Sequence, residues 1–267
     1  MPPPRLDADQ VVFVGTGGGR MTTAFQARAT GGLWVCLDGV WVSVDPGPGA
    51  LAHARGRALN LDPSVLAAVV LTHKHLDHSG DVNAMIEAMT QGGTKKRGVV
   101  YAPRDAYDVD PVILKYVRSY PAATETLTPG GRYPLGGDGG PVLETPILLK
   151  HPVETYGLRF VGRRFSVALV ACTGYVPEIE TALRADLLIL NVVYREPRDE
   201  IHLAVPDAHR LISAMRPRLA VITHFGLTML RARPWDLAET LSRDTGVRVL
   251  AARDRWRLDL EAELGGD

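Results

Sequence analysis

Short apolar runs separated by turn residues mark the first part of the chain. Val and Trp recur in three runs, Val11 to Val14, Leu33 to Leu37 and Val40 to Val44. Branched and aromatic residues favour extended backbone, so each run is predicted to be a strand. Asp38-Gly39 between the second and third runs is typical of a tight hairpin turn. Because no helical pattern separates these runs, we expect the sheet to begin with antiparallel strands.

Beyond residue 66 the pattern changes to an alternation of strands and helices. The helical candidates are Val82 to Met89, Asp207 to Met215 and Pro234 to Ser242, the last with proline in its first turn. The strand candidates are Ala67 to Leu71, Gly98 to Ala102, Ile147 to Lys150, Ser166 to Ala171, Leu187 to Leu190, Leu219 to Thr223 and Arg248 to Ala251. Residues 127–142 are rich in Gly and Pro and predict a loop with at most a short hairpin. The whole pattern predicts an α/β fold of two sheets covered by helices, forming one domain over residues 1–267.

Composition narrows the classes of function. Thirty basic residues balance thirty acidic ones, so no overall field attracts nucleic acid or an anionic membrane. No apolar run approaches a membrane span, and the N-terminal residues lack the apolar stretch of a secretory signal. Cys36 and Cys172 are the only cysteines, too few for a disulfide framework. We therefore expect a cytoplasmic protein that associates with no membrane.

A dense cluster of metal-ligand residue types follows the run Ala67 to Leu71. It reads His73-Lys74-His75-Leu76-Asp77-His78. A strand that leads into a tight turn places these imidazoles and the carboxylate at short separations, as two adjacent metals require. Further ligand types stand at the ends of later strands or in turns, namely His151, Cys172, His202 and His224. The pattern predicts a metal centre built from distant segments at strand ends.

These motifs together resemble those of the metallo-β-lactamase fold superfamily, and within it the ribonuclease Z branch of metal-dependent hydrolases. The cluster at residues 73–78 matches the superfamily motif HxHxDH, and Asp45-Pro46-Gly47 resembles the turn placed beneath the metals. Phe13 to Gly19, Ala171 to Tyr175 and Thr223 to Gly226 extend the likeness. The fold that this resemblance implies is a four-layer αββα sandwich with the metals at one edge.

The resemblance also implies a ligand set. It assigns His73, His75 and His151 to a first metal, and Asp77, His78 and His224 to a second, with Asp77 also among the catalytic residues. Cys172 stands where most relatives have a bridging aspartate. A thiolate there would favour zinc, so two Zn²⁺ ions are expected, with manganese or iron as alternatives. The alternative for Cys172 is a small buried residue that binds no metal.

A second departure concerns proton transfer. Ribonuclease Z enzymes pair a glutamate with a histidine that protonates the leaving oxygen. Asn191 occupies the glutamate position here, while His202 matches the histidine. An asparagine orients an imidazole but does not stabilise its cation as a carboxylate does. His202 is therefore expected to be a weaker general acid, assisted by Asp199 or Glu200, or else a structural histidine.

The function implied is hydrolysis by a metal-bound hydroxide, with a small phosphodiester as the expected substrate. Esters, lactones or thioesters of carboxylic acids are the alternative, and a degenerate protein that binds metal without turnover is the second alternative. Lys95-Lys96-Arg97 is more typical of a solvated loop than of a nucleic-acid grip, so specific nucleic-acid binding is not expected. By analogy with the family, a homodimer is expected.

Two further features of the sequence bear on substrate binding. The glycine-rich segment Gly15 to Gly19 fails the dinucleotide-binding pattern because Arg20 takes the place of its third glycine. We interpret the segment as a tight turn near the metals, with Arg20 as a candidate phosphate contact. Tyr107, Tyr116 and Tyr120 are candidates to line a substrate cleft, although such aromatic spacing is more often part of a core.

Overall fold

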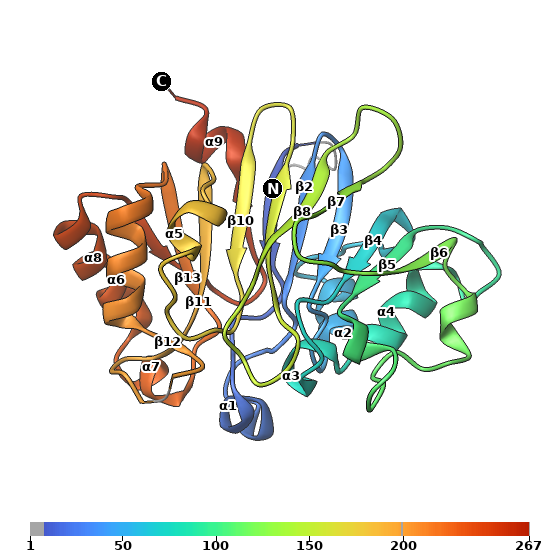
Figure 1. Cartoon of the computed structure of the whole chain (residues 1–267), viewed down its shortest axis with the longest axis horizontal. Helices are drawn as coiled ribbons and strands as arrows, with labels where there is room; N and C mark the ends of the chain where they lie inside the picture. The colour runs from blue at the N-terminus through green and yellow to red at the C-terminus, as the bar shows by residue number, and fades with distance from the viewer. Residues whose placement is uncertain (1–7, 199, 267) are drawn as a thin grey trace.

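Two packed β-sheets form the centre of the protein, and helices cover their outer faces (Figure 1). The computed structural model describes residues 8–198 and 200–266. Within them the strands are β1 (Gln10–Phe13), β2 (Leu33–Leu37), β3 (Val40–Val44), β4 (Leu66–Val70), β5 (Val99–Ala102), β6 (Ala123–Thr126), β7 (Gly131–Pro134), β8 (Val142–Leu148), β9 (Tyr156–Val161), β10 (Ser166–Val170), β11 (Leu187–Tyr194), β12 (Leu203–Ala204), β13 (Leu219–Thr223), β14 (Val249–Ala251) and β15 (Trp256–Asp259). The α-helices are α1 (Arg20–Phe25), α2 (Ala50–Arg55), α3 (Leu76–Ser79), α4 (Val82–Met89), α5 (Ile179–Ala182), α6 (Val205–Met215), α7 (Leu227–Arg231), α8 (Pro234–Thr245) and α9 (Leu260–Leu264). Short 3-10 helices lie at Pro63–Val65, Arg104–Ala106 and Val117–Ser119.

The first sheet has the strand order β15-β1-β2-β3-β4-β5-β6. β1, β2 and β3 pair in antiparallel fashion, as expected from the absence of a helix between them. Asp38 and Gly39 both have positive φ, 52° and 78°, which suits the two central positions of the hairpin turn. From β3 to β6 the pairing is parallel, so the carboxyl ends of β3, β4 and β5 lie at the same edge.

The second sheet has the order β14-β13-β11-β10-β9-β8-β7, with β12 paired to β11. Its β7 to β10 half is antiparallel, whereas β10, β11, β13 and β14 are parallel. Parallel neighbours end at one edge, and helices connect them across the outer face. The carboxyl ends of β10, β11 and β13 therefore lie together.

Three apolar clusters separate the layers. One lies between the sheets and includes Phe13, Val44 and Leu169. A second joins the second sheet to α5, α6 and α8, and a third joins the first sheet to α2 and α4. Such an arrangement buries both faces of each sheet, which explains strands that are apolar on both sides. The four-layer α/β sandwich expected from the sequence is confirmed.

The sequence prediction was wrong at several boundaries. The strand expected at Ile147 to Lys150 is β8, which begins at Val142 inside the predicted loop and ends at Leu148. The hairpin allowed for in that loop is present, as β7 paired with β8. β9 was missed because Gly157 interrupts its pattern; a Cβ there would lie 2.6 Å from Leu183 Cδ1, so the strand needs glycine at this contact.

No helix in the described part of the chain is long and apolar enough to cross a membrane.

Candidate metal centre

The predicted ligands converge at one edge of the sandwich, near α1, α3 and α7 in Figure 1. The segment after β4 supplies His73 and His75, and α3 supplies Asp77 and His78. The remaining predicted ligands follow the strands of the second sheet: His151 comes after β8, Cys172 after β10 and His224 after β13. All seven ligands named from the sequence are therefore brought together at strand ends.

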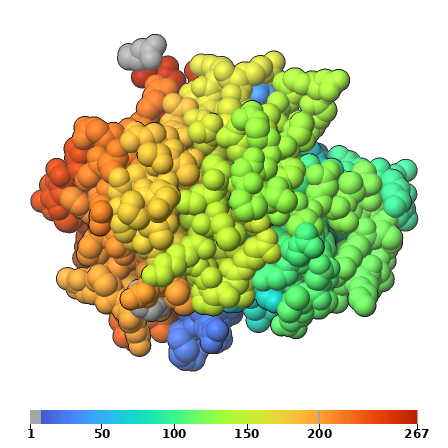
Figure 2. All heavy atoms as spheres, in the orientation of Figure 1, coloured from blue at the N-terminus to red at the C-terminus, as the bar shows by residue number. Residues whose placement is uncertain are grey.

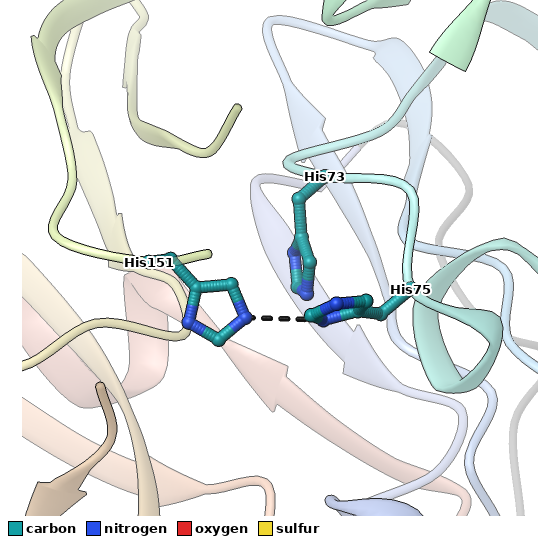
Figure 3. Close-up of side chains that lie close together, drawn as sticks. All are labelled: His73, His75 and His151. Atoms are coloured by element: carbon teal, nitrogen blue, oxygen red, sulfur yellow. Dashed lines mark hydrogen bonds between the residues drawn. The ribbon is translucent and has the colours of Figure 1, made fainter. Parts of the chain in front are cut away.

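The first group of donors consists of His73, His75 and His151, which face one another in Figure 3. Nε2 of His151 lies 3.1 Å from Nδ1 of His75, and both rings lie 4.9 Å from that of His73, centroid to centroid. Burial lowers the pKa of His73 well below its ordinary range and lowers the pKa of His151 to about 4. These imidazoles are therefore neutral at physiological pH, which is the form that binds metal.

In two rings of this group, those of His73 and His151, a hydrogen bond holds the outer nitrogen. Nδ1 of His73 lies 3.0 Å from the Thr72 hydroxyl, and Nδ1 of His151 lies 3.1 Å from the carbonyl oxygen of Ile201. A hydrogen bond at one ring nitrogen fixes the tautomer and directs the other nitrogen inward. Nε2 of His73 is buried and has no hydrogen-bond partner among the described residues. A buried nitrogen without a partner, aimed at other donors, fits a metal ligand.

The second group of donors consists of Asp77, His78 and His224. Oδ2 of Asp77 lies 3.4 Å from Nε2 of His224 and 3.7 Å from Nε2 of His78. Burial opposes protonation of both imidazoles, but the nearby negative charges of Asp77 and Cys172 prevail. They raise the pKa of His78 well above its ordinary value and that of His224 to about 9. In the metal-free protein, protons on these rings thus balance the anionic ligands.

Cys172 lies between the two groups. Its Sγ is 3.5 Å from Nε2 of His78 and 3.3 Å from Nε2 of His224, and it also forms a candidate donor set with His73 and His78. Burial alone would raise the pKa of the thiol, but the charges of His224 and His78 lower it to about 6. A thiolate is the form that binds metal. Its position supports the prediction that Cys172 is a ligand.

The buried carboxylate of Asp45 orients His78 of the second group. Asp45 accepts hydrogen bonds from the Thr72 backbone N–H and hydroxyl, each at 2.7 Å. Its Oδ2 also lies 2.9 Å from Nδ1 of His78. A proton held on Nδ1 leaves Nε2 of His78 with the lone pair that a metal requires. The Asp-x-Gly turn singled out in the sequence therefore fixes a ligand tautomer.

The glycine-rich segment packs directly against the second group. Its backbone pairs with Phe225, and a Cβ on Gly18 would lie 2.2 Å from Cδ2 of His224. The N–H of Gly19 donates to Oδ2 of Asp77 at 3.0 Å. His224 itself has φ of 61°, a backbone conformation that is uncommon for a residue with a side chain. The segment thus lies at the donor cluster, as predicted, but its backbone is extended and paired with Phe225 instead of forming a tight turn. Its glycines permit the close approach.

The donor chemistry of both groups fits metal ions. Within each candidate set the ligand atoms lie within 4.8 Å of one another. Three imidazole nitrogens form one set, whereas two imidazoles, a carboxylate and a thiolate surround the other, and zinc accepts all of these ligand types. The described residues therefore contain a cluster that could hold two metals.

His202 lies at the rim of this cluster. Its ring centroid is 5.3 Å from that of His151 and 5.7 Å from that of Tyr194. Tyr194 carries the Arg198 guanidinium over its ring at 5.8 Å. Of the two carboxylates expected to assist His202, Glu200 is exposed and pairs with Lys150 at 2.9 Å, while Asp199 lies outside the described residues. Tyr194 is a rim residue that the sequence reading missed, because an aromatic residue in a strand carries no signal beyond packing.

Other candidates from the sequence lie as follows. Arg20 is exposed at the start of α1, and its charge contributes to lowering the pKa of His75, after burial and neighbouring charges. Lys96 donates to the carbonyl oxygen of Ser119, which agrees with a loop role for Lys95-Lys96-Arg97. Tyr107 and Tyr120 pack against the core between the first sheet and α4, so these two are not cleft residues. Tyr116 is exposed and makes an edge-to-face contact with the ring of Tyr120.

Comparison with known proteins agrees with this geometry. The family model of the beta-lactamase superfamily domain matches residues 40–225. An uncharacterized protein of Methanocaldococcus jannaschii is 33% identical over 269 residues, which covers 96% of this chain and 95% of that protein. Ribonuclease Z of Kineococcus radiotolerans is 24% identical over 319 residues, covering 96% and 93% of the two chains.

A solved structure shares the fold. The metallo-beta-lactamase fold protein YhfI from Bacillus subtilis has a TM-score of 0.75 and 20% sequence identity, covering 94% of this chain and 99% of that one. The matched region of the family model begins at β3 and ends just beyond His224, so it contains all seven predicted ligands. This chain belongs to the beta-lactamase superfamily.

Proposed function

We propose that the protein is a metal-dependent hydrolase of small phosphodiesters, with zinc as its metal. The observation that carries the proposal is the pair of adjacent donor groups that meet at Cys172. Likeness to a ribonuclease Z over 96% of the chain favours a phosphodiester over a carboxylic ester. The absence of net charge in the chain favours a small substrate over a polymer.

His73, His75 and His151 would hold one metal, and Asp77, His78, His224 and Cys172 would hold the other. When bound, two such ions supply Lewis acidity, lower the pKa of water and neutralise charge on a phosphoryl group. The protein contributes position. Three of the imidazole rings bond through one nitrogen to the Thr72 hydroxyl, the Asp45 carboxylate or the Ile201 carbonyl, which turns their other nitrogen inward.

His202 is the general acid that protonates the leaving group in this proposal. It is half-buried at the rim, next to the first donor group, and touches Tyr194. An imidazole is suited to this task because its ordinary pKa lies close to neutral pH. Arg20 on the protruding helix α1, blue at the lower edge of Figure 2, supplies a positive charge toward a bound phosphate.

The test is turnover of bis(p-nitrophenyl) phosphate by zinc-loaded and manganese-loaded protein, with a chelator-treated sample alongside. We expect turnover that is lost on chelation and in His75→Ala. The matched control is His209→Ala, because His209 lies on α6 outside the candidate metal groups. Absence of turnover by protein that carries both metals would refute phosphodiester hydrolysis and direct the search to carboxylic esters, lactones and thioesters. If these are also inert, the chain binds metal without catalysis.

A further inference from the structure

Three neighbouring parallel strands bring Cys172, Asn191 and His224 to the same edge of the second sheet. Val170 of β10 pairs with Leu190 of β11, and Asn191 in turn pairs with Thr223 of β13. Cys172 and His224 follow these paired positions by two residues and one residue, respectively. Parallel pairing in register therefore places the Asn191 side chain among groups that surround the second donor group.

The Asn191 amide faces the cysteine sulfur. Its Nδ2 lies 3.9 Å from Sγ of Cys172, and the two side chains are 5% and 2% exposed. Sγ has His78 and His224 as its other polar neighbours, at 3.5 and 3.3 Å. The amide thus approaches the sulfur from the β11 side, whereas the imidazoles approach it from the donor cluster.

We propose that Asn191 is a positioning residue for Cys172: its amide N–H donates to the sulfur and directs the thiolate toward the second metal. The inference rests on the proposed function only in requiring that metal binds there. The sequence departs from the family pattern at two positions, with Cys172 in place of the bridging aspartate and Asn191 in place of the glutamate. On this proposal the two replacements are coupled. A carboxylate at position 191 would add another buried negative charge beside the thiolate and Asp77, whereas an amide donates a hydrogen bond and adds no charge.

The hydrogen bond also sets the electronic character of the ligand. A thiolate that accepts an N–H is a weaker electron donor, so the metal keeps more of its Lewis acidity. Residues that orient a ligand from outside the coordination shell commonly change metal affinity by about 10- to 100-fold when replaced.

The test uses the full-length protein loaded with cobalt in place of zinc. Asn191→Leu removes the amide at nearly constant shape; Asn191→Ala is the second variant if leucine prevents folding. We expect second-site affinity to fall about 10- to 100-fold and the sulfur-to-cobalt charge-transfer band to move to longer wavelength. The matched control is Asn83→Leu, because the Asn83 amide bonds Val112 and Leu114 instead of the metal cluster.

A double-variant comparison separates positioning from a general structural effect. In a Cys172→Ala background, Asn191→Leu is expected to change second-site affinity less than 2-fold, because the acceptor sulfur is gone. The proposal is overturned if Asn191→Leu leaves the band and the affinity unchanged, or if it weakens metal binding equally with and without Cys172. Both readouts are independent of turnover, so an inactive protein that gives the expected result would count against the hydrolase proposal alone.

Discussion

Asp45→Asn tests how the protein selects the metal-binding tautomer of His78. The substitution keeps the shape of the side chain, and asparagine tolerates the positive φ of 50° at this position. Both oxygens of Asp45 accept hydrogen bonds, from Thr72 and from Nδ1 of His78. An asparagine has an NH₂ group in place of one of these oxygens, so it cannot accept all of these bonds. The ring then either loses its partner or moves its proton to Nε2, where a metal would bind.

The magnitude follows from the hydrogen bonds that Asp45 makes. Loss of one buried hydrogen bond to a charged group costs about 1.5–3 kcal/mol. In a domain of this size each kcal/mol shifts the melting temperature by about 2–4 °C, so the metal-free variant is expected to melt roughly 3–12 °C lower. Second-site metal affinity is expected to fall about 10- to 100-fold, the usual effect of removing a partner of a ligating histidine.

The assays are thermal melting of chelator-treated protein and competitive zinc titration against a coloured indicator. Asp38→Asn is the matched control: Asp38 also has positive φ, 52°, and bonds Arg163 outside the metal cluster. The Asp38 side chain is 7% exposed and Arg163 is 74% exposed. Because this pair does not touch the metal cluster, the control should keep its zinc affinity. Equal melting temperature and equal zinc affinity in Asp45→Asn and the parent protein would refute the reasoning.

Three further predictions address the same centre. Gly18→Ala should weaken the second site in zinc titration, because its Cβ would lie 2.2 Å from the His224 ring; unchanged affinity would contradict the contact. Zinc binding near pH 7.5 should release about two protons per chain, because raised pKa values keep His78 and His224 protonated in the metal-free protein. Calorimetry in buffers of different ionisation enthalpy measures this release, and no release would contradict the protonation of these two histidines. His202→Ala should lower kcat about 10²- to 10⁴-fold for an alkyl phosphodiester, and less for a nitrophenyl ester, at constant zinc content; equal losses would exclude proton donation.

The sequence predicted the architecture and the donor cluster at residues 73–78 because both depend on local signals. His73, His75, Asp77 and His78 lie close together in any chain that turns sharply after a strand. Apolar runs with Val and Trp at β2 and β3 allowed exact boundaries. His151, Cys172 and His224 were found only because each stands near the end of a strand and the family resemblance names it.

What the sequence could not predict depends on contacts between distant segments. The approach of the Asn191 amide to Cys172 follows from strand register, which no local pattern specifies. In the same way, the carbonyl oxygen of Ile201 holds His151 through backbone, which carries no residue signature. β8 was misplaced because its first residue, Val142, is the last of a segment rich in Gly and Pro, where sheet pairing overrides local preference.

The most direct measurement is the zinc content of the dialysed protein, determined by mass spectrometry for the parent chain, His75→Ala and His224→Ala. Two separate donor groups predict about two zinc ions per parent chain and the loss of one in each variant, since each substitution damages one group. A parent chain that holds no zinc, or variants that hold as much as the parent, would contradict a centre built from these two groups.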